Sequence, residues 1–167
     1  RVLAAGETGT VYFERDDVAF RYHNDTDRTR EAQHPEHPNW TTTGDIGHVD
    51  EDGYLFLTDR KAFMIISGGV NVYPQEAEDV LVLHPAVADV AVVGVPDAEM
   101  GESVKAVVQV ERGIVPGPEL ERALIDFARE RIAHYKAPRS VDFTERLPRT
   151  PTGKLAKSRL RDAYRGG

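Results

Sequence analysis

The kind of secondary structure that the sequence favours changes near residue 60, and this change most constrains the fold. Before it lie short β-prone runs at Val11–Phe13 and Ala19–Tyr22, and a hairpin signal at Asp52-Gly53. The polar stretch 23–39 is expected to be a surface loop. After residue 60, strand-like and helix-like segments alternate. The sequence therefore predicts an α+β fold, in which a β-rich first part precedes a small α/β lobe with helices packed on a mixed sheet of a few strands.

The predicted elements of the second part follow from local patterns. Pro74 suits the first turn of a helix that stops before His84-Pro85. A second helix is expected over 119–133, because Leu120, Leu124 and Phe127 recur with helical spacing. The other predicted elements are β-branched strands at 87–95 and 104–110, a short strand at 139–143, a turn-rich loop at 146–154 and a basic helix at 155–164.

Composition excludes several classes of function. The chain has no Cys, so disulfides, thiol nucleophiles and Cys-ligated metals are excluded, and this suits a cytoplasmic location. No apolar run approaches the roughly 20 residues of a membrane helix, and no signal peptide is recognised. His34 and His37 have possible metal spacing, but no further ligand follows, so a solvated pair and no metal site are expected.

Charge is distributed unevenly along the chain. The net charge of −7 argues against nucleic acid as the main partner. Residues 129–165 nevertheless carry 11 Lys and Arg against 4 Asp and Glu. A basic tail on an acidic body favours contact between the tail and an anion, whereas the alternative is a solvated helix face.

Four separate stretches resemble one family, the acyl-adenylate-forming superfamily, and within it the AMP-forming acyl-CoA synthetases. They are Trp40-Thr41-Thr42-Thr43-Gly44-Asp45; the stretch from Thr58-Asp59-Arg60 to Pro74-Gln75-Glu76; Ala133-His134-Tyr135-Lys136-Ala137-Pro138; and Leu147 to Lys154, "LPRTPTGK". Together, in order and suitably spaced, they cover nearly the whole chain. The resemblance implies the C-terminal end of such an enzyme. The start at Arg1 without an initiator Met agrees with a piece cut from a longer protein.

Two residues of the first part are candidates for nucleotide binding. Asp45 follows a Thr-Gly turn, and a carboxylate there can accept two hydrogen bonds from a vicinal diol. The resemblance implies that Asp45 holds the ribose of ATP or AMP, whereas the alternative is a turn-forming Asp. Arg60 carries a planar cation suited to oxygen anions, and the resemblance makes it a second nucleotide contact. Its alternative is a surface ion pair with Asp59 or another neighbour.

Two residues of the second part are further candidates. Ser67-Gly68-Gly69 has little side-chain bulk, so a thin ligand could approach its backbone. The resemblance places Gly69 beside the tunnel for the pantetheine arm of CoA, and the alternative is an ordinary glycine turn. Lys154 follows Thr152-Gly153, a mobile and exposed presentation, and resembles the family's adenylation lysine. The segment lacks the spacing of a P-loop, and without the motif Lys154 would be a solvated surface residue.

The hinge departs from the family's pattern. Family members usually carry Asp or Lys two residues after the motif Arg, followed by an acidic residue, whereas this chain has Ala62 and Phe63. Ala still permits a change of backbone angles. The predicted organisation is 1–59 as the β-rich end of the N-terminal adenylation domain, 60–62 as the hinge, and 63–167 as a C-terminal lid domain carrying the catalytic Lys.

The resemblance implies an ATP-dependent ligase. A carboxylic acid, by analogy a fatty acid, would attack ATP to give acyl-AMP, and CoA would then accept the acyl group, with Mg²⁺ accompanying ATP. The phosphate loop and acyl pocket would belong to the preceding N-terminal domain, so the fragment is expected to be inactive alone. The alternatives are an adenylating enzyme that uses a carrier-protein thiol, and a non-catalytic binding module that keeps the fold.

Overall fold

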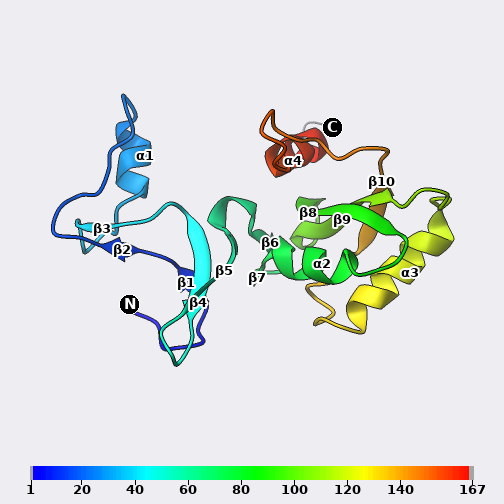
Figure 1. Cartoon of the computed structure of the whole chain (residues 1–167), viewed down its shortest axis with the longest axis horizontal. Coiled ribbons are helices and arrows are strands. Elements are labelled where there is room, and N and C mark those ends of the chain that lie inside the picture. The colour runs from blue at the N-terminus through cyan, green and yellow to red at the C-terminus, as the bar shows by residue number, and fades with distance from the viewer. Residues whose placement is uncertain (1, 166–167) are drawn as a thin grey trace. The chain divides into compact units, whose positions relative to one another are not determined.

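The computed structural model describes residues 2–165 of the chain. The chain divides into two compact units, Arg1–Ala62 and Phe63–Gly167, and each is treated separately below (Figure 1). No helix in the range 2–165 combines the length and the apolar composition that a bilayer crossing requires.

The first unit is built from small antiparallel sheets. The hairpin of β4 (Asp45–Val49) and β5 (Leu55–Arg60) pairs with β1 (Gly9–Thr10), and β2 (Phe13–Glu14) pairs with β3 (Trp40–Thr41). In the hairpin turn, Asp50 Oδ1 accepts hydrogen bonds from the backbone of Asp52 and Tyr54 at 3.0 and 2.8 Å. Gly53 adopts a φ of 86°, which a residue with a side chain rarely does. The predicted hairpin is therefore confirmed.

Two predictions for the first unit are wrong. The segment 23–39, expected to be a loop, contains the helix α1 (Thr26–Glu31). Asp25 starts this helix because its carboxylate accepts the backbone N–H of Arg28 at 2.9 Å. Thr29 fixes the preceding segment, because its hydroxyl accepts the Tyr22 N–H at 2.9 Å. That segment, 19–22, was expected to be a strand and pairs with no other strand.

The second unit contains a mixed five-stranded sheet organised around one long ribbon. The ribbon pairs β8 (Val87–Asp97) with β9 (Gly101–Val110) in antiparallel register along their whole length. On its other side β9 pairs in parallel with β10 (Ser140–Phe143), and at Gly101 with β6 (Ile65–Ser67). The strand β7 (Val70–Val72) completes a hairpin with β6. The 3-10 turn Lys61–Phe63 precedes β6.

Helices cover both faces of this sheet (Figure 1). On one face, α2 (Pro74–Leu81) and α3 (Pro118–Arg129) share one core with Val90 and Val92 of β8. On the other, α4 (Lys157–Arg165) packs against Ala91 and Val93. Because successive strand residues alternate between two covered faces, β8 is apolar almost without interruption. This arrangement confirms the predicted α+β class.

The predicted helix 119–133 is too long at its C-terminal end. Its last turn tightens after Arg129, where the Arg131 N–H donates to the Ala128 carbonyl three residues earlier, at 3.0 Å. Ile132 still packs against the core from beyond the helix. The apolar pattern therefore runs past the point at which helical geometry ends.

Candidate functional site

Asp45 and Arg60 form an ion pair on neighbouring strands. They stand opposite each other in the register of β4 and β5, and Arg60 Nε lies 3.2 Å from Asp45 Oδ1. The Asp45 side chain is 20% exposed and that of Arg60 is 63% exposed. The structure therefore brings the two predicted nucleotide contacts together in the first unit.

The second carboxylate oxygen of Asp45 is also hydrogen-bonded. Thr43 Oγ1 donates to Asp45 Oδ2 at 2.6 Å, a contact that the sequence reasoning missed. Each carboxylate oxygen has two lone pairs, so Asp45 keeps acceptor capacity for the hydroxyls of a diol. A carboxylate oriented by a hydroxyl and a guanidinium on its flanks is pre-organised to accept such hydrogen bonds.

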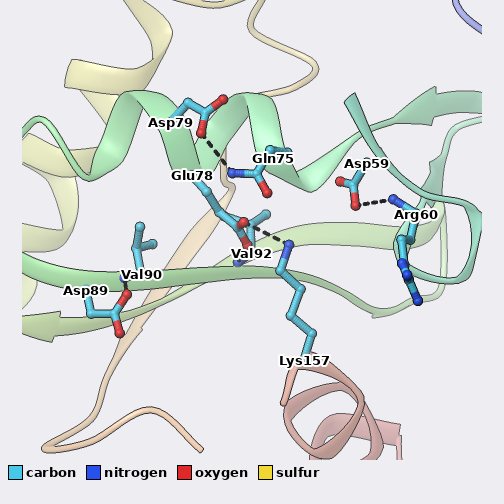
Figure 2. A network of polar contacts seen from close by, with 9 residues as sticks. All are labelled: Asp59, Arg60, Gln75, Glu78, Asp79, Asp89, Val90, Val92 and Lys157. Carbon is cyan, nitrogen blue, oxygen red and sulfur yellow. Dashed lines mark hydrogen bonds and ion pairs between the residues drawn. The ribbon is translucent and has the colours of Figure 1, made fainter. Parts of the chain in front are cut away.

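Local backbone geometry fixes this carboxylate. Gly44 takes a φ of 85°, and its N–H donates to Thr42 Oγ1 at 3.0 Å. Its carbonyl accepts the N–H of Lys61 at 2.8 Å, which continues the pairing of the two strands. Asp59 contacts Arg60 through the backbone, because its Oδ1 accepts the Arg60 N–H at 2.6 Å (Figure 2). The guanidinium itself pairs with Asp45.

Gly68 and Gly69 form the tight turn between β6 and β7. Their φ values are 57° and 79°, the signs that a two-residue hairpin turn with a primed geometry requires. A Cβ at Gly68 would lie 2.5 Å from the Cε of Met100, whereas one at Gly69 would meet nothing within 4 Å. Gly69 is thus the open side of the turn, the side from which a thin ligand could approach the backbone.

Lys154 lies in a second tight turn, which precedes α4. Thr150 N donates to the Lys154 carbonyl at 2.8 Å, and Lys154 N donates to Thr150 Oγ1 at 3.1 Å. Gly153 supports the turn with a φ of 84°. The Lys154 side chain is exposed, and within residues 2–165 its ammonium makes no ion pair. The exposure agrees with the prediction, but the backbone is tied down, so the freedom to reach a ligand lies in the side chain.

A buried ion pair that the sequence reasoning missed anchors the helix after Lys154. Lys157 Nζ lies 2.8 Å from Glu78 Oε2, and both side chains are only 9% exposed. Glu78 Oε1 also accepts the Val92 N–H of β8 at 2.6 Å (Figure 2). Among the strands of residues 2–165, β8 pairs only with β9, so the Val92 N–H lies on a sheet edge that would otherwise be unpaired. The pair joins α2 and α4 at that edge.

The other end of α4 is held by a cluster on β9 and β10. Tyr164 donates to Asp142 at 2.6 Å, and Lys105 Nζ lies 2.8 Å from the same carboxylate. Burial and the hydrogen bond to Asp142 raise the pKa of the Tyr164 hydroxyl well above its usual value. Burial pushes the pKa of Asp142 up, but the hydrogen bonds from Lys105 and Tyr164 outweigh it and leave that pKa lowered. Both ends of α4 are thus fixed to the sheet.

The third motif contributes a helix-to-loop contact. Lys136 Nζ lies 2.6 Å from Glu76 Oε2 in the first turn of α2. The hydrogen bond to Glu76 raises the pKa of Lys136 despite partial burial. A role for Lys136 in supporting α2 is therefore visible, and no ligand contact is needed to explain it.

No metal site is assigned to the described chain. Across 2–165, no three or more His, Asp or Glu side chains gather closely enough to hold an ion. The rings of His34 and His37 both pack against Trp40.

Comparisons with known proteins agree on one family. Residues 76–154 match the model of the AMP-binding enzyme C-terminal domain. The chain is 42% identical over 156 residues to the long-chain-fatty-acid–CoA ligase FadD13 of Mycobacterium tuberculosis, covering 93% of this chain and 30% of that protein. It is 41% identical over 165 residues to the long-chain-fatty-acid–CoA ligase of Salmonella typhimurium, covering 98% of this chain and 28% of the relative.

Solved structures give the same result. The ATP-bound MatB from Rhodopseudomonas palustris superposes with a TM-score of 0.85 at 33% identity, covering 97% of this chain and 31% of that one. The chain thus spans about 30% of the length of the relatives it matches. The four motifs, the sheet with its helices and these likenesses agree, and the chain belongs to the AMP-binding, acyl-adenylate-forming enzymes as a C-terminal portion of such an enzyme.

Proposed function

We propose that the full-length protein activates a carboxylic acid with ATP and transfers the acyl group to CoA. The observation that carries this proposal is Lys154, an exposed ammonium at the end of a backbone-locked turn in the family's C-terminal domain. The Asp45–Arg60 pair, with acceptor capacity left on the carboxylate, supports nucleotide binding by the first unit.

The residues take different parts in the proposed reaction. Asp45 accepts the ribose hydroxyls, and Arg60 orients Asp45 and contacts ribose or phosphate. Lys154 neutralises the negative charge that develops as the acid's carboxylate attacks the α-phosphate and pyrophosphate leaves. It forms no covalent bond, so positioning and charge stabilisation supply the rate enhancement.

The second half of the reaction uses a different part of the small domain. The CoA thiol attacks the acyl carbon of acyl-AMP, AMP leaves, and the open side of Gly69 admits the pantetheine arm. A rotation of the domain that begins after Ala62 would withdraw Lys154 and present the Gly69 turn. Ala62 lacks a polar side chain that could favour one orientation. Mg²⁺ would enter with ATP and balance the charge of its phosphates.

A fatty acid is the proposed substrate class. FadD13 and the Salmonella relative are both named long-chain-fatty-acid–CoA ligases, and each is more than 40% identical to this chain. The acyl pocket lies outside the described residues by this proposal, in the preceding domain of the same protein. Chain length is therefore a property to be measured on the full-length enzyme.

The test is a substitution of Lys154 in the full-length enzyme. Lys154→Ala should lower fatty-acid-dependent ATP–pyrophosphate exchange by about 100-fold or more, because it removes a charge that acts in the transition state. Arg159→Ala removes an exposed cation from α4 nearby and should leave exchange unchanged. If Lys154→Ala exchanged pyrophosphate at the wild-type rate, the catalytic role of Lys154 would be lost. This portion of the protein would then be better described as a non-catalytic module that keeps the fold.

A second experiment uses the chain as given. Incubated with ATP, Mg²⁺, CoA and a panel of fatty acids, residues 1–167 should release no pyrophosphate, because the proposed phosphate loop and acyl pocket are elsewhere. Sustained release above a protein-free control would show that the small portion holds a complete active site.

A further inference from the structure

The β8–β9 ribbon carries one functional turn near each of its ends. Asp89 lies near the start of β8, and Glu102 near the start of β9, where it pairs with Pro96. Seven residue steps along β8 separate Asp89 from Pro96, which corresponds to about 23 Å in a strand. Each carboxylate is linked to a different turn, Asp89 through Arg149 and Glu102 through Ile66 of β6, and the two links share no residue.

Asp89 holds the Lys154 turn through Arg149. One nitrogen of the Arg149 guanidinium donates to Asp89 Oδ2, and the other donates to the Gly153 carbonyl at 2.8 Å. Asp89 Oδ1 also accepts the backbone N–H of Val90 at 3.0 Å, which fixes the carboxylate on the strand. A planar guanidinium that binds both partners holds the Gly153 carbonyl, which directly precedes Lys154, in place relative to β8.

Glu102 holds the Gly69 turn. Its Oε2 accepts the N–H of Ile66 at 3.0 Å, and its Oε1 accepts a hydrogen bond from Arg165 at 2.6 Å. The Ile66 N–H faces away from β7. On that side β6 pairs with β9 at Ser67 and Gly101, and within the described residues Ile66 has no pairing residue on β9. The carboxylate therefore replaces a missing backbone acceptor.

Two neighbours reinforce the contact made by Glu102. The Gly68 N–H donates to the Met100 carbonyl at 2.9 Å, so the turn is tied to the ribbon twice. Gly94 leaves room for the carboxylate, because a Cβ at that position would stand 3.1 Å from it. The Glu102 side chain is 21% exposed, so its hydrogen bonds are partly shielded from water.

We propose that Asp89 and Glu102 are positioning residues that each serve one half-reaction. Asp89 serves acyl-adenylate formation by orienting the Lys154 turn through Arg149. Glu102 serves thioester formation by orienting the Gly69 turn. The proposal rests on the proposed function of those two turns, and it adds that the two steps can be damaged separately, because their supports are independent.

The experiment measures the two half-reactions of the full-length enzyme separately. The first is fatty-acid-dependent ATP–pyrophosphate exchange, and the second is formation of acyl-CoA from supplied acyl-adenylate and CoA. Asp89→Ala should slow the first about tenfold and leave the second within twofold, since it removes a charge-assisted hydrogen bond that orients the turn. Glu102→Ala should do the reverse. Glu130→Ala, which removes an exposed carboxylate at the end of α3, is the matched control and should change neither.

The experiment distinguishes a loss of folding from a specific loss of one half-reaction. A general loss of stability slows both steps together, so the ratio of the two rates is the informative quantity. If either alanine variant fails to give a cooperative thermal transition, Asp89→Asn and Glu102→Gln are measured instead, because they retain size and lose the charge. Equal slowing of both steps, or no slowing of either, would overturn the proposal.

The same assays separate this inference from the proposed function. If Lys154→Ala leaves exchange unchanged, or Gly69→Val leaves thioester formation unchanged, the role of that turn is wrong. If those variants are impaired while Asp89→Ala and Glu102→Ala behave like wild type, the turns act as proposed and only their supports are misassigned. Arg149→Lys offers a further check, because it keeps the charge but cannot reach both partners, and it should slow only the first step.

Discussion

Thr43 helps to orient the Asp45 carboxylate in the candidate nucleotide site. Its hydroxyl donates to the Asp45 carboxylate at 2.6 Å from an exposed position, so the bond contributes about 1 kcal/mol. Thr43→Val keeps the shape and loses the donor. In the full-length enzyme we expect the KM for ATP to rise about fivefold with little change in kcat, because the bond orients a binding group in both ground and transition states.

The control for this prediction is a hydroxyl on the adjacent strand. Thr10→Val removes a hydroxyl that, within the described part of the chain, makes no hydrogen bond. It should leave the KM for ATP at the wild-type value. An unchanged KM in Thr43→Val would mean that the Arg60 guanidinium alone orients Asp45.

His84 makes the stability of the second unit depend on pH. Burial, and secondarily the charge of Arg131, lower the pKa of His84 below 6.5. Its Nδ1 accepts the Ala86 N–H at 3.2 Å, which only an unprotonated nitrogen can do. The unfolded chain therefore binds the proton first, and stability falls as the pH drops through 6.5.

The matched variant for His84 is Asn. An Asn side chain can accept the same N–H two residues ahead but does not titrate. Urea unfolding at pH 7.5 and 5.5 should show a smaller loss of unfolding free energy in His84→Asn than in the wild type. The prediction is contradicted if the two proteins lose equal stability on acidification.

At the scale of elements, the Glu78–Lys157 pair decides how α4 is attached. Removing one partner of a buried ion pair leaves the other charge uncompensated, which costs about 3–5 kcal/mol. Lys157→Met keeps an unbranched side chain of similar length but loses the ammonium. It should lower the unfolding free energy by about 3 kcal/mol, since the pair lies at a sheet edge. Chemical denaturation followed by circular dichroism measures this loss. Arg159→Met, on the exposed side of the same helix, should cost less than about 0.5 kcal/mol.

The elements that the sequence predicted well are those with strong local signals. Val87 to Val95 holds five β-branched valines in nine residues, and the strand continues two residues further, to Asp97. The glycines at 68 and 69 indicated a turn, and their positive φ values agree. By contrast, α1 is six residues long, and its start depends on one capping carboxylate at Asp25, a signal that also fits a turn.

Contacts between residues far apart in the chain could not be predicted from the sequence. The hairpin turn near Asp52 indicated that β4 and β5 pair, but not which side chains face each other. The residues nearest the turn pair with a register that would set Asp45 opposite Asp59. A bulge between Ile46 and Gly47 shifts the register by one residue and places Arg60 opposite Asp45. The Asp45–Arg60 ion pair of the candidate site therefore depends on a β-bulge that no sequence motif predicts.

At the scale of the whole molecule, the two units differ in how much core each encloses. Among the described residues, the buried apolar side chains of the first unit are Ala32 and Ile46. Several of its larger apolar side chains, including Tyr54, Phe56 and Leu57, are half exposed or more. The second unit buries two clusters of side chains, one on each face of its sheet. Burial of apolar surface is the main force that offsets the entropy of ordering a chain, so the units should differ in their ability to fold alone.

We therefore expect residues 63–167, expressed alone, to fold and residues 1–62, expressed alone, to remain unfolded. A domain of about 100 residues with a core on both sheet faces is of ordinary size, whereas about 60 residues with two buried apolar side chains cannot offset their entropy. Dispersed amide resonances and a cooperative thermal transition are expected for the first fragment, and narrow dispersion with no transition for the second. In that case the β4–β5 hairpin and its Asp45–Arg60 pair depend for their geometry on the preceding N-terminal domain of the full-length protein, whereas the Lys154 and Gly69 turns do not. A cooperative transition in 1–62 would show that the ion pair and the small sheets suffice, and that the nucleotide contacts are preformed without that preceding domain.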